Sequence, residues 1–242
     1  MQARVNKLYQ NTPRHIYAAA FSAIELTLIC LILFSSLPTI AVCYSAIVVA
    51  FLFALPFLNA NLKENVYILA ALFLTLVADF FLVIEYGITG QYVYQCLGVS
   101  AFCAVHFFYF LYLYKERGKG RFLLRLLIRL FISLTAAEVS GIILKENSNF
   151  LSVASVVCFS WLIINIVVSL LSFKKTWLFF SGLLFFALCD LWVGLQNAHN
   201  VFFTIPEGVL SSIVFPPFNA VWLCYGLSQT LIVLHLILKN SR

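Results

Sequence analysis

Charged side chains are scarce in this sequence. They make up 10% of its 242 residues, while hydrophobic residues make up 63%. A soluble domain carries about 25% charged residues, and only short polar stretches separate the hydrophobic segments here. The composition therefore excludes an ordinary soluble domain and predicts an integral membrane protein.

Signatures of several soluble enzyme classes are also missing. The sequence contains no GxSxG, no P-loop and no dinucleotide-binding glycine pattern. None of the seven cysteines forms a CxxC pair, and all seven fall inside hydrophobic segments, which is typical of small buried residues. The four histidines show neither HxxxH nor HxxE spacing, although His106 could join Asp79 and Asp190 as a zinc ligand from another helix. We expect no metal and no cofactor.

Eight hydrophobic segments are long enough to cross a membrane as helices, since a span needs about 17–25 apolar residues. They cover residues 16–36, 39–58, 66–85, 92–114, 124–144, 150–172, 177–196 and 215–238. We therefore predict an all-α, polytopic membrane helix bundle, with residues 1–242 forming a single transmembrane domain. The last segment opens with Pro216-Pro217, and residues 200–214 before it are apolar enough to lie at the membrane interface.

The placement of positive charge supports this number of helices. With eight spans, 14 of the 15 lysines and arginines fall on one side of the membrane and only Lys145 falls on the other. The larger set comprises Arg4, Lys7, Arg14, Lys63, Lys115, Arg117, Lys119, Arg121, Arg125, Arg129, Lys174, Lys175, Lys239 and Arg242. Cytoplasmic loops carry the excess of lysine and arginine, so we predict that both termini are cytoplasmic. The net charge of +6 then reflects topology, and we expect no nucleic-acid partner.

Two aspartates lie at matching depths inside hydrophobic segments. Asp79 belongs to the third segment and Asp190 to the seventh. A carboxylate near the middle of the hydrocarbon costs about 2.5 kcal/mol or more, so acids in such places usually serve a function. Two carboxyls that share a dry site favour one protonated and one ionised group, as acid–base hydrolysis requires. A structural pair and a proton relay remain alternatives.

Four other polar groups lie inside the predicted spans. Glu25 is in the first segment, His106 in the fourth, Glu138 in the fifth and Gln229 in the eighth. Single polar groups of this kind most often form interhelical hydrogen bonds that hold a bundle together, at about 0.6 kcal/mol each. Taken singly, none of them indicates catalysis.

The connection between the fourth and fifth segments has a regular basic pattern. Arg117, Arg121, Arg125 and Arg129 recur every four residues, which would place them on one helical face. This pattern is typical of a positive anchor at the cytoplasmic surface. It also fits a strip that binds anionic lipid headgroups, with Arg117, Arg121 and Arg125 as the candidate contacts.

Short polar motifs recur along the spans. They are Asp79 in ADFFLVIEYG, His106 and Tyr109 in VHFFYF, Asp190 and Asn197 in FFALCDLWVGLQN, and Tyr225 and Gln229 in YGLSQTLIV. Taken together, they resemble the motifs of the YhhN/TMEM86 family, the eight-helix lysoplasmalogenases. These motifs follow the family order over about residues 66–235. Ala78, Cys189 and Ala198 depart from the Gly, Ser and Lys that stand at these positions in the family or in many of its members.

The resemblance implies that the substrate is a lysophospholipid and that its vinyl ether bond is hydrolysed to a fatty aldehyde and a glycerophospho-base. Asp79 and Asp190 would be the catalytic acid and carboxylate, in an order that the sequence does not decide. The substrate-binding residues would be His106, Tyr109, Asn197, Tyr225 and Gln229. The membrane would be the cell membrane in a bacterium or the endoplasmic reticulum in a eukaryote. A lipid or proton-coupled transporter that uses the same acids is the alternative.

Overall fold

The computed structural model describes residues 14–34, 39–59, 64–117, 120–199 and 204–239. The long helices are α2 (Arg14–Phe34), α3 (Thr39–Ala54), α4 (Asn65–Asp79), α6 (Tyr92–Arg117), α7 (Phe122–Leu144), α8 (Phe150–Leu170), α9 (Phe173–Ala198) and α11 (Ala220–Lys239). The short ones are the 3₁₀ helices η1 (Leu55–Asn59) and η3 (Lys145–Asn147), the π-helical segment η2 (Phe80–Glu85), α5 (Tyr86–Thr89) and α10 (Val209–Val214). Eight helical spans in the described ranges are long and apolar enough to cross a membrane. The predicted all-α polytopic bundle is therefore confirmed.

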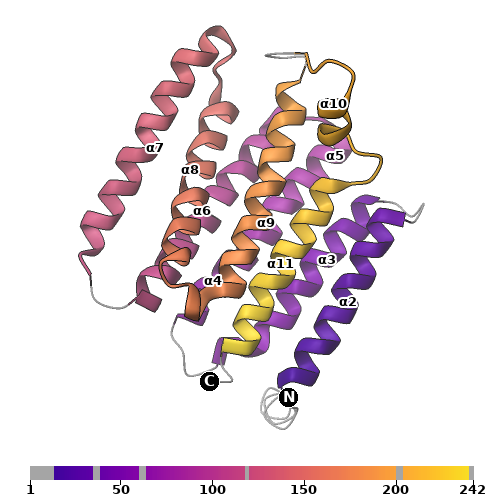
Figure 1. The fold of residues 1–242 in the computed structure, drawn as a ribbon, viewed down its shortest axis with the longest axis vertical. Helices are drawn as coiled ribbons and strands as arrows, with labels where there is room; N and C mark the ends of the chain where they lie inside the picture. Colours follow the sequence, from indigo (N-terminus) through magenta and orange to yellow (C-terminus); the bar gives the residue numbers. More distant parts are fainter. Residues whose placement is uncertain (1–13, 35–38, 60–63, 118–119, 200–203, 240–242) are drawn as a thin grey trace.

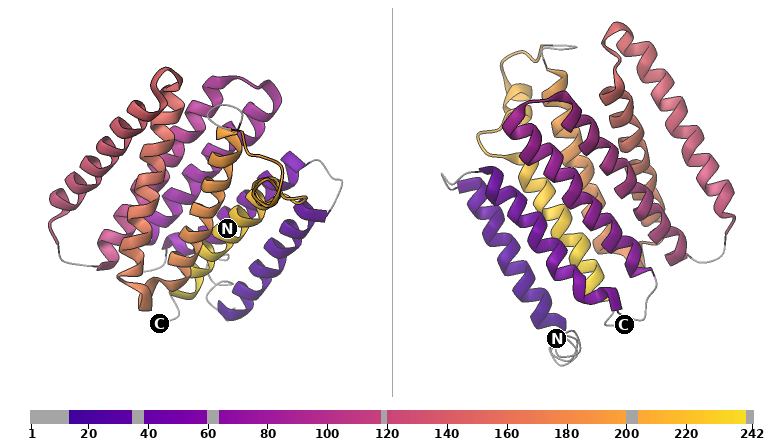
Figure 2. Two further views of the ribbon diagram at one scale, coloured as in Figure 1. Left: turned by 45° about the horizontal axis from the view of Figure 1, so that its top comes forward. Right: turned by 180° about the vertical axis from the view of Figure 1, so that it is seen from behind.

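The helices form two layers (Figure 1). One layer follows the order α7, α8, α9, α11 and α2, and each of these helices packs against the next. The second layer contains α6, α4 and α3, which are seen in front when the molecule is viewed from behind (Figure 2). Contacts between α6 and α8 and between α3 and α11 join the layers. Helix α7 lies at one edge, whereas α11 lies between neighbours and is the most buried of the spans.

Glycine allows the closest approach inside this arrangement. Gly182 of α9 faces α11, where an added Cβ would lie 3.0 Å from the carbonyl oxygen of Ser228 and 2.8 Å from Ile232. Small residues of this kind let membrane helices pack backbone to backbone, because lipid-facing helices gain little from the hydrophobic effect. The sequence between Gly182 and Asp190 is thereby held tightly against α11.

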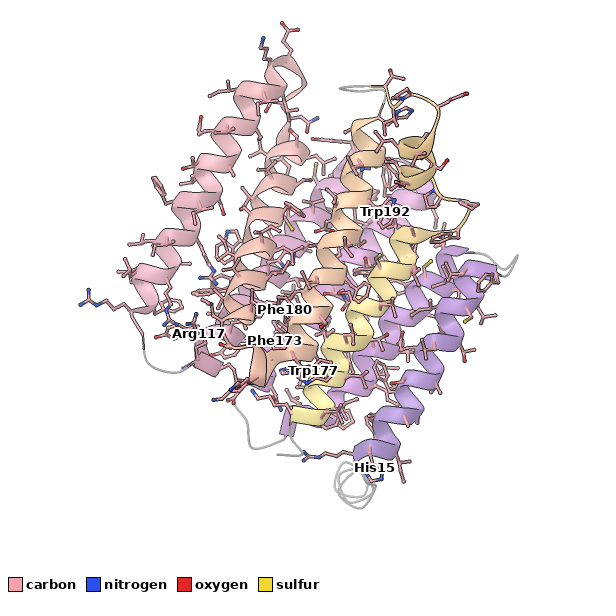
Figure 3. The ribbon with its side chains drawn as sticks, viewed as in Figure 1. His15, Arg117, Phe173, Trp177, Phe180 and Trp192 are labelled. Atoms are coloured by element: carbon pink, nitrogen blue, oxygen red, sulfur yellow. The ribbon has the colours of Figure 1, made fainter. Side chains whose placement is uncertain are left out.

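The last span begins later than the sequence indicates. Helix α11 starts at Ala220 and not at residue 215, because Pro216-Pro217 cannot supply backbone donors to a helix interior. Before it, α10 lies against the end of α9, where Trp192 Nε1 donates to the carbonyl of Ile213 at 3.0 Å. Figure 3 shows Trp192 at this end of the molecule.

The basic repeat does not occupy a single helix. Arg117 is the last residue of α6, and Arg121 is the residue before α7. Only Arg125 and Arg129 share a helical face, one turn apart in α7. The prediction of a common face for all four arginines is therefore wrong, because the chain changes direction around Gly120.

Both described ends of the chain, Arg14 and Lys239, lie at the same end of the bundle, as an even number of spans requires (Figure 1). Among the described residues, Lys145 in η3 lies at the opposite end, after α7 has crossed the bundle. Five members of the larger basic set, Arg4, Lys7, Lys63, Lys119 and Arg242, lie outside the described residues. The membrane side that each end faces stays a prediction.

Candidate active site in the bundle interior

Asp79 is buried at the last residue of α4. Its side chain is 3% exposed, and the Tyr225 hydroxyl of α11 donates to its Oδ2 at 2.5 Å. Tyr225 is itself 5% exposed. The hydrogen bond therefore joins the two layers of the bundle within the membrane-spanning region, between two residues 146 positions apart in the sequence.

The backbone changes geometry directly after Asp79. Residues Phe80–Glu85 form a π-helical turn, and the N–H of Phe80 bonds to the carbonyls of both Leu76 and Val77. Such turns are rare and frequently mark functional sites, since they re-aim side chains and leave backbone groups less regularly bonded. The sequence carried no signal for this feature.

Gly98 of α6 permits the close packing that supports this turn. An added Cβ would lie 3.0 Å from the carbonyl oxygen of Ala78 and would collide with the Leu82 side chain. A residue larger than glycine would push α6 away from the backbone that carries Asp79. The position of Asp79 therefore depends on α6 as well as on α4 and α11.

Three aromatic rings, one of them that of Tyr225, form a layer beside Asp79. Phe102 of α6 lies edge-on to Phe186 of α9 at 5.5 Å and to Tyr225 at 6.3 Å, and Phe186 lies 5.5 Å from Tyr225. The rings come from α6, α9 and α11, so they fill the space where the two layers face each other. They give the Asp79–Tyr225 pair an apolar wall.

Asp190 is half-buried on α9, and no hydrogen bond to its carboxyl is found in the part of the chain that the structure describes. It lies close enough to Cys158 of α8 to influence that thiol electrostatically. Cys189, next to it, lies within electrostatic range of both Asp79 and Asp190. Both carboxyls thus influence the Cys189 thiol, while no hydrogen bond and no electrostatic effect of one carboxyl on the other occurs among the described residues.

His106 and Tyr109 lie deeper in the bundle, at full burial. The His106 ring packs edge-on against Phe186 at 5.2 Å and lies 6.0 Å from the Tyr109 ring. Neither ring nitrogen of His106 has a hydrogen-bond partner among the described residues. Because Phe186 contacts both His106 and Tyr225, these residues form one continuous cluster.

Gln229 follows Tyr225 by one turn on α11 and is 1% exposed. Neither its amide oxygen nor its amide nitrogen has a partner within the described ranges. Asn197 differs, because it is exposed near the outer end of α9, about two turns beyond Asp190. The structure therefore gathers six of the seven predicted site residues in the interior and leaves Asn197 outside.

Glu25 and Glu138 have opposite environments. Glu25 of α2 is 1% exposed, and neither carboxyl oxygen has a partner in the described structure. Glu138 of α7 is exposed on the edge helix. Burial therefore makes Glu25 a third acid of the interior, while Glu138 belongs to the outer surface of the bundle.

A second polar cluster, at the end of the bundle near Arg14, was not predicted. The Tyr112 hydroxyl and His235 Nε2 are 2.5 Å apart, and Lys239 Nζ donates to that hydroxyl at 3.4 Å. Lys239 also forms ion pairs with Glu116 and, at 3.5 Å, with Glu64. His235 falls near a helix end, where a sequence pattern does not reveal its partner Tyr112 on α6.

No group of three or more histidine, cysteine, aspartate and glutamate side chains in the described ranges is arranged to hold a metal ion. In particular, His106 is not gathered with Asp79 and Asp190 into such a group. The interior can instead supply two carboxyls, one of which accepts a strong hydrogen bond, together with an amide, an imidazole and two phenols in apolar surroundings. Such a set can transfer protons and stabilise a cation.

Comparison with known proteins identifies one family model. The YhhN family model matches residues 38–236, which extend from α3 to α11. No curated protein and no solved structure matches the chain. The matched stretch contains all seven predicted site residues and leaves out α2, which carries Glu25.

Proposed function

The chain belongs to the YhhN family, whose model covers most of its length, and we propose on this basis that it is a membrane hydrolase that cleaves the vinyl ether bond of lysoplasmalogens. The products are a fatty aldehyde and a glycerophospho-base. The observation that carries the proposal is the buried Asp79–Tyr225 pair beside an aromatic layer, with Asp190 acting on the same Cys189 thiol as Asp79. An acid–base pair in apolar surroundings suits a substrate that is itself a lipid.

Asp190 is the general acid in this proposal. A hydrogen-bond donor favours the charged form of the carboxyl group that accepts the bond. Asp79 accepts the Tyr225 hydroxyl and therefore serves as the carboxylate. Asp190 has no donor among the described residues and therefore serves as the proton source. The two acids would lie on either side of the reacting double bond, which agrees with the absence of a hydrogen bond between them in the described structure.

The reaction starts when Asp190 transfers its proton to the alkene carbon farther from the ether oxygen. The electron pair of the double bond forms the new C–H bond, and the remaining oxocarbenium ion is stabilised by the Asp79 carboxylate. Asp79 then removes a proton from water as the water oxygen attacks this cation. The resulting hemiacetal breaks its C–O bond to the glycerol, and proton transfers that involve the two acids release the aldehyde and the glycerol hydroxyl.

The remaining interior residues bind and orient the substrate. Gln229 offers an unpaired amide to the glycerol oxygens, and His106 offers an unpaired imidazole. Tyr109 lies against Phe179 at 5.2 Å and completes the wall on the side of α6. Asn197 is given no role in the reaction step, because it lies outside this cluster.

The proposal is tested by incubating the purified protein with a 1-alkenyl lysophospholipid in deuterated water. We expect release of an aldehyde with one deuterium on the carbon next to the carbonyl, because that carbon receives the proton from the enzyme. A 1-alkyl lysophospholipid of the same chain length should release no aldehyde. If folded protein releases no aldehyde from the alkenyl substrate, the proposal is wrong.

Glu25 favours a second candidate function. It is a third buried acid, its carboxyl oxygens have no partner in the described structure, and the hydrolysis does not use it. Chains of intramembrane acids form proton relays in transporters, so a proton-coupled lipid transporter remains the alternative. Reconstituted vesicles distinguish the two, since a transporter would move an uncleavable lysolipid across the bilayer in response to a pH gradient, with loss of transport in Glu25→Gln.

A further inference from the structure

Arg129 is a buried cation that has no anionic partner among the residues that the structure describes. Its side chain on α7 is 4% exposed, and its guanidinium lies 4.3 Å above the Phe110 ring. Of its five N–H donors, one makes a hydrogen bond in the described structure, from Nη2 to Asn165 Oδ1 at 3.4 Å. The Nε atom is buried and has no partner among the described residues.

The charges around Arg129 favour the binding of an anion. The side chains that act on it electrostatically are Arg125 and Arg117, both positive. All nine acidic residues of the sequence are within the described ranges, and none forms an ion pair with these arginines there. Glu116, the acid next to Arg117, is engaged by Lys239. An isolated buried charge is strongly unfavourable, so three gathered guanidinium groups point to an anion that the chain itself does not supply.

The exposed end of this group of arginines lies beside a pocket. The pocket has a volume of about 500 Å³, and its polar lining is Glu116, Arg117, Ser172, Lys174 and Lys175, whereas Arg125 and Arg129 do not line it. Figure 3 shows Arg117 at the lower end of the bundle, near the start of α7. Exposure falls from Arg117, which is exposed, through Arg125, which is half-buried, to Arg129, which is buried. The guanidinium groups therefore lead from the surface into the bundle.

The geometry also links this corner to the candidate active site. Asn165 donates from Nδ2 to the backbone carbonyl of His106 at 2.9 Å. Cys158, whose thiol lies within electrostatic range of Asp190, precedes Asn165 by seven residues on the same face of α8. Seven residues correspond to about 10 Å along a helix. Arg129 thus lies on the same side of the bundle as Asp190, closer to the end that carries Arg14.

We propose that Arg129, with Arg125 and Arg117, binds the phosphate of the lysophospholipid substrate while its vinyl ether reaches Asp190. One guanidinium group can bind two oxygens of the same phosphate through two parallel N–H donors. In a lysoplasmalogen only the glycerol backbone separates the phosphate from the vinyl ether, so one lipid can reach both sites only if the phosphate site and Asp190 lie on the same side of the bundle. The identity of this lipid as substrate rests on the proposed function, whereas the phosphate site rests on the arginines.

Binding is measured with a 1-alkyl lysophosphoethanolamine, which has no vinyl bond to cleave, and with a 1-alkylglycerol of the same chain, which has no phosphate. Trp161 provides the signal through its fluorescence, because its ring lies 6.0 Å from the Phe110 ring beneath Arg129. The wild-type protein should bind the phospholipid more tightly than the alkylglycerol. Arg129→Met should weaken phospholipid binding roughly 10- to 100-fold, since it removes charge-assisted hydrogen bonds, and should leave alkylglycerol binding unchanged.

The matched control is Lys115→Met, which removes one positive charge from an exposed position at the same end of the bundle and should change binding less than about twofold. Arg129→Met should melt at the same or a higher temperature without ligand, because it removes an unpaired buried charge. If Arg129→Met does not fold, the double substitution Arg117→Gln, Arg125→Gln at less buried positions provides the same comparison. Equal phospholipid binding by wild type and by whichever of these variants folds would overturn the proposal.

Two further measurements identify the source of the phosphate and separate this inference from the proposed function. Inorganic phosphate that binds as tightly as the phospholipid would overturn the lipid assignment. Asp79→Asn should keep the preference for the phospholipid. A wild-type protein that shows the preference but releases no aldehyde would retain the phosphate site and refute the hydrolase. Aldehyde release by wild type, with an unchanged preference in Arg129→Met, would refute the phosphate site alone.

Discussion

The two polar clusters of the interior are built from similar residues and differ in how their charges are compensated. Near the end that carries Arg14, Lys239 lies between Glu64 and Glu116, and Tyr112 bonds to His235. In the membrane-spanning interior, Asp79 has one phenol partner, and Asp190 has no ion pair or hydrogen bond among the described residues. Helices α6 and α11 contribute to both clusters, and the segment around α4 supplies Glu64, directly before the helix, to one and Asp79, at its end, to the other.

This difference in charge compensation distinguishes a structural cluster, around Lys239, from a candidate catalytic cluster, around Asp79. A charge between two opposite charges holds helix ends in place, because its desolvation is repaid by ion pairs. A carboxyl without a cation is kept at a cost to stability, and such groups gather at active sites. We therefore expect substitutions in the cluster around Lys239 to change stability and substitutions around Asp79 to change activity.

The largest effect is expected from removing either interior aspartate. Asp79→Asn and Asp190→Asn keep shape and polarity and remove acid–base capacity, so each should lower aldehyde release by at least about 100-fold. If the two act as one unit, the double substitution should lose little more than either single one. Initial rates with the alkenyl lysophospholipid measure both.

Both variants should fold, since the asparagine has no charge to bury. Melting temperatures in detergent provide this control. Full aldehyde release by the folded double variant would contradict the distinction between the two clusters, because Asp79 and Asp190 would then have no role in the reaction.

The next effect concerns the partner of Asp79. Tyr225→Phe removes the hydroxyl that donates to Oδ2 and leaves the ring in its aromatic layer. A hydrogen bond to a charged group contributes about 1.5–3 kcal/mol, so turnover should fall roughly 10- to 100-fold.

Tyr44→Phe is the matched control, because the Tyr44 hydroxyl lies 3.5 Å from the carbonyl of Leu76 and forms no hydrogen bond with the Asp79 carboxyl in the described structure. It should change turnover less than about threefold. Equal losses in the two variants would mean that any phenol near α4 matters and that Tyr225 has no special role.

In the paired cluster, the expected effect is on stability. Lys239→Met removes ion pairs to Glu64 and Glu116 and leaves two carboxylates without a cation. The side chains are partly exposed, so the loss should be about 2 kcal/mol, less than for a fully buried pair. The melting temperature in detergent should fall, while the turnover of folded protein should stay within about twofold of wild type.

Lys174→Met removes the same charge from an exposed residue and should leave the melting temperature unchanged. A loss of turnover without a change of melting temperature in Lys239→Met would place this cluster in the reaction and remove the distinction between the two regions.

The smallest effect on activity is expected from two cysteine variants that test which end of the bundle faces the cytoplasm. Lys174→Cys lies at the end that carries Arg14, and Glu146→Cys lies at the opposite end (Figure 1). An impermeant thiol reagent should reach Lys174→Cys only from the cytoplasm and Glu146→Cys only from outside. Activity should stay unchanged in both. Labelling of both positions from one side would contradict the topology.

The helices were largely predictable because each span must satisfy its own backbone in lipid. Long apolar runs therefore identified all eight spans, and the structure differs mainly where proline or a change of direction decides a boundary, as before Ala220 and around Gly120. The interior aspartates were also identifiable, because a charge in an apolar run stands out. The π-helical turn after Asp79 was not, since its sequence, FFLVIE, fits an ordinary helix equally well.

By itself, the sequence determined the membrane class, the eight spans, the family and the six interior residues, because scarcity of charge, run length and short motifs are properties of the linear chain. Only the tertiary structure decided that Tyr225 bonds to Asp79, that His235 and Lys239 form a separate paired cluster, that Asn197 stays outside and that Arg129 turns inward. These outcomes depend on which helices are neighbours and how they are rotated. Rotation and neighbourhood are set by packing between residues far apart in sequence, such as Gly182 against Ser228 and Gly98 against Ala78.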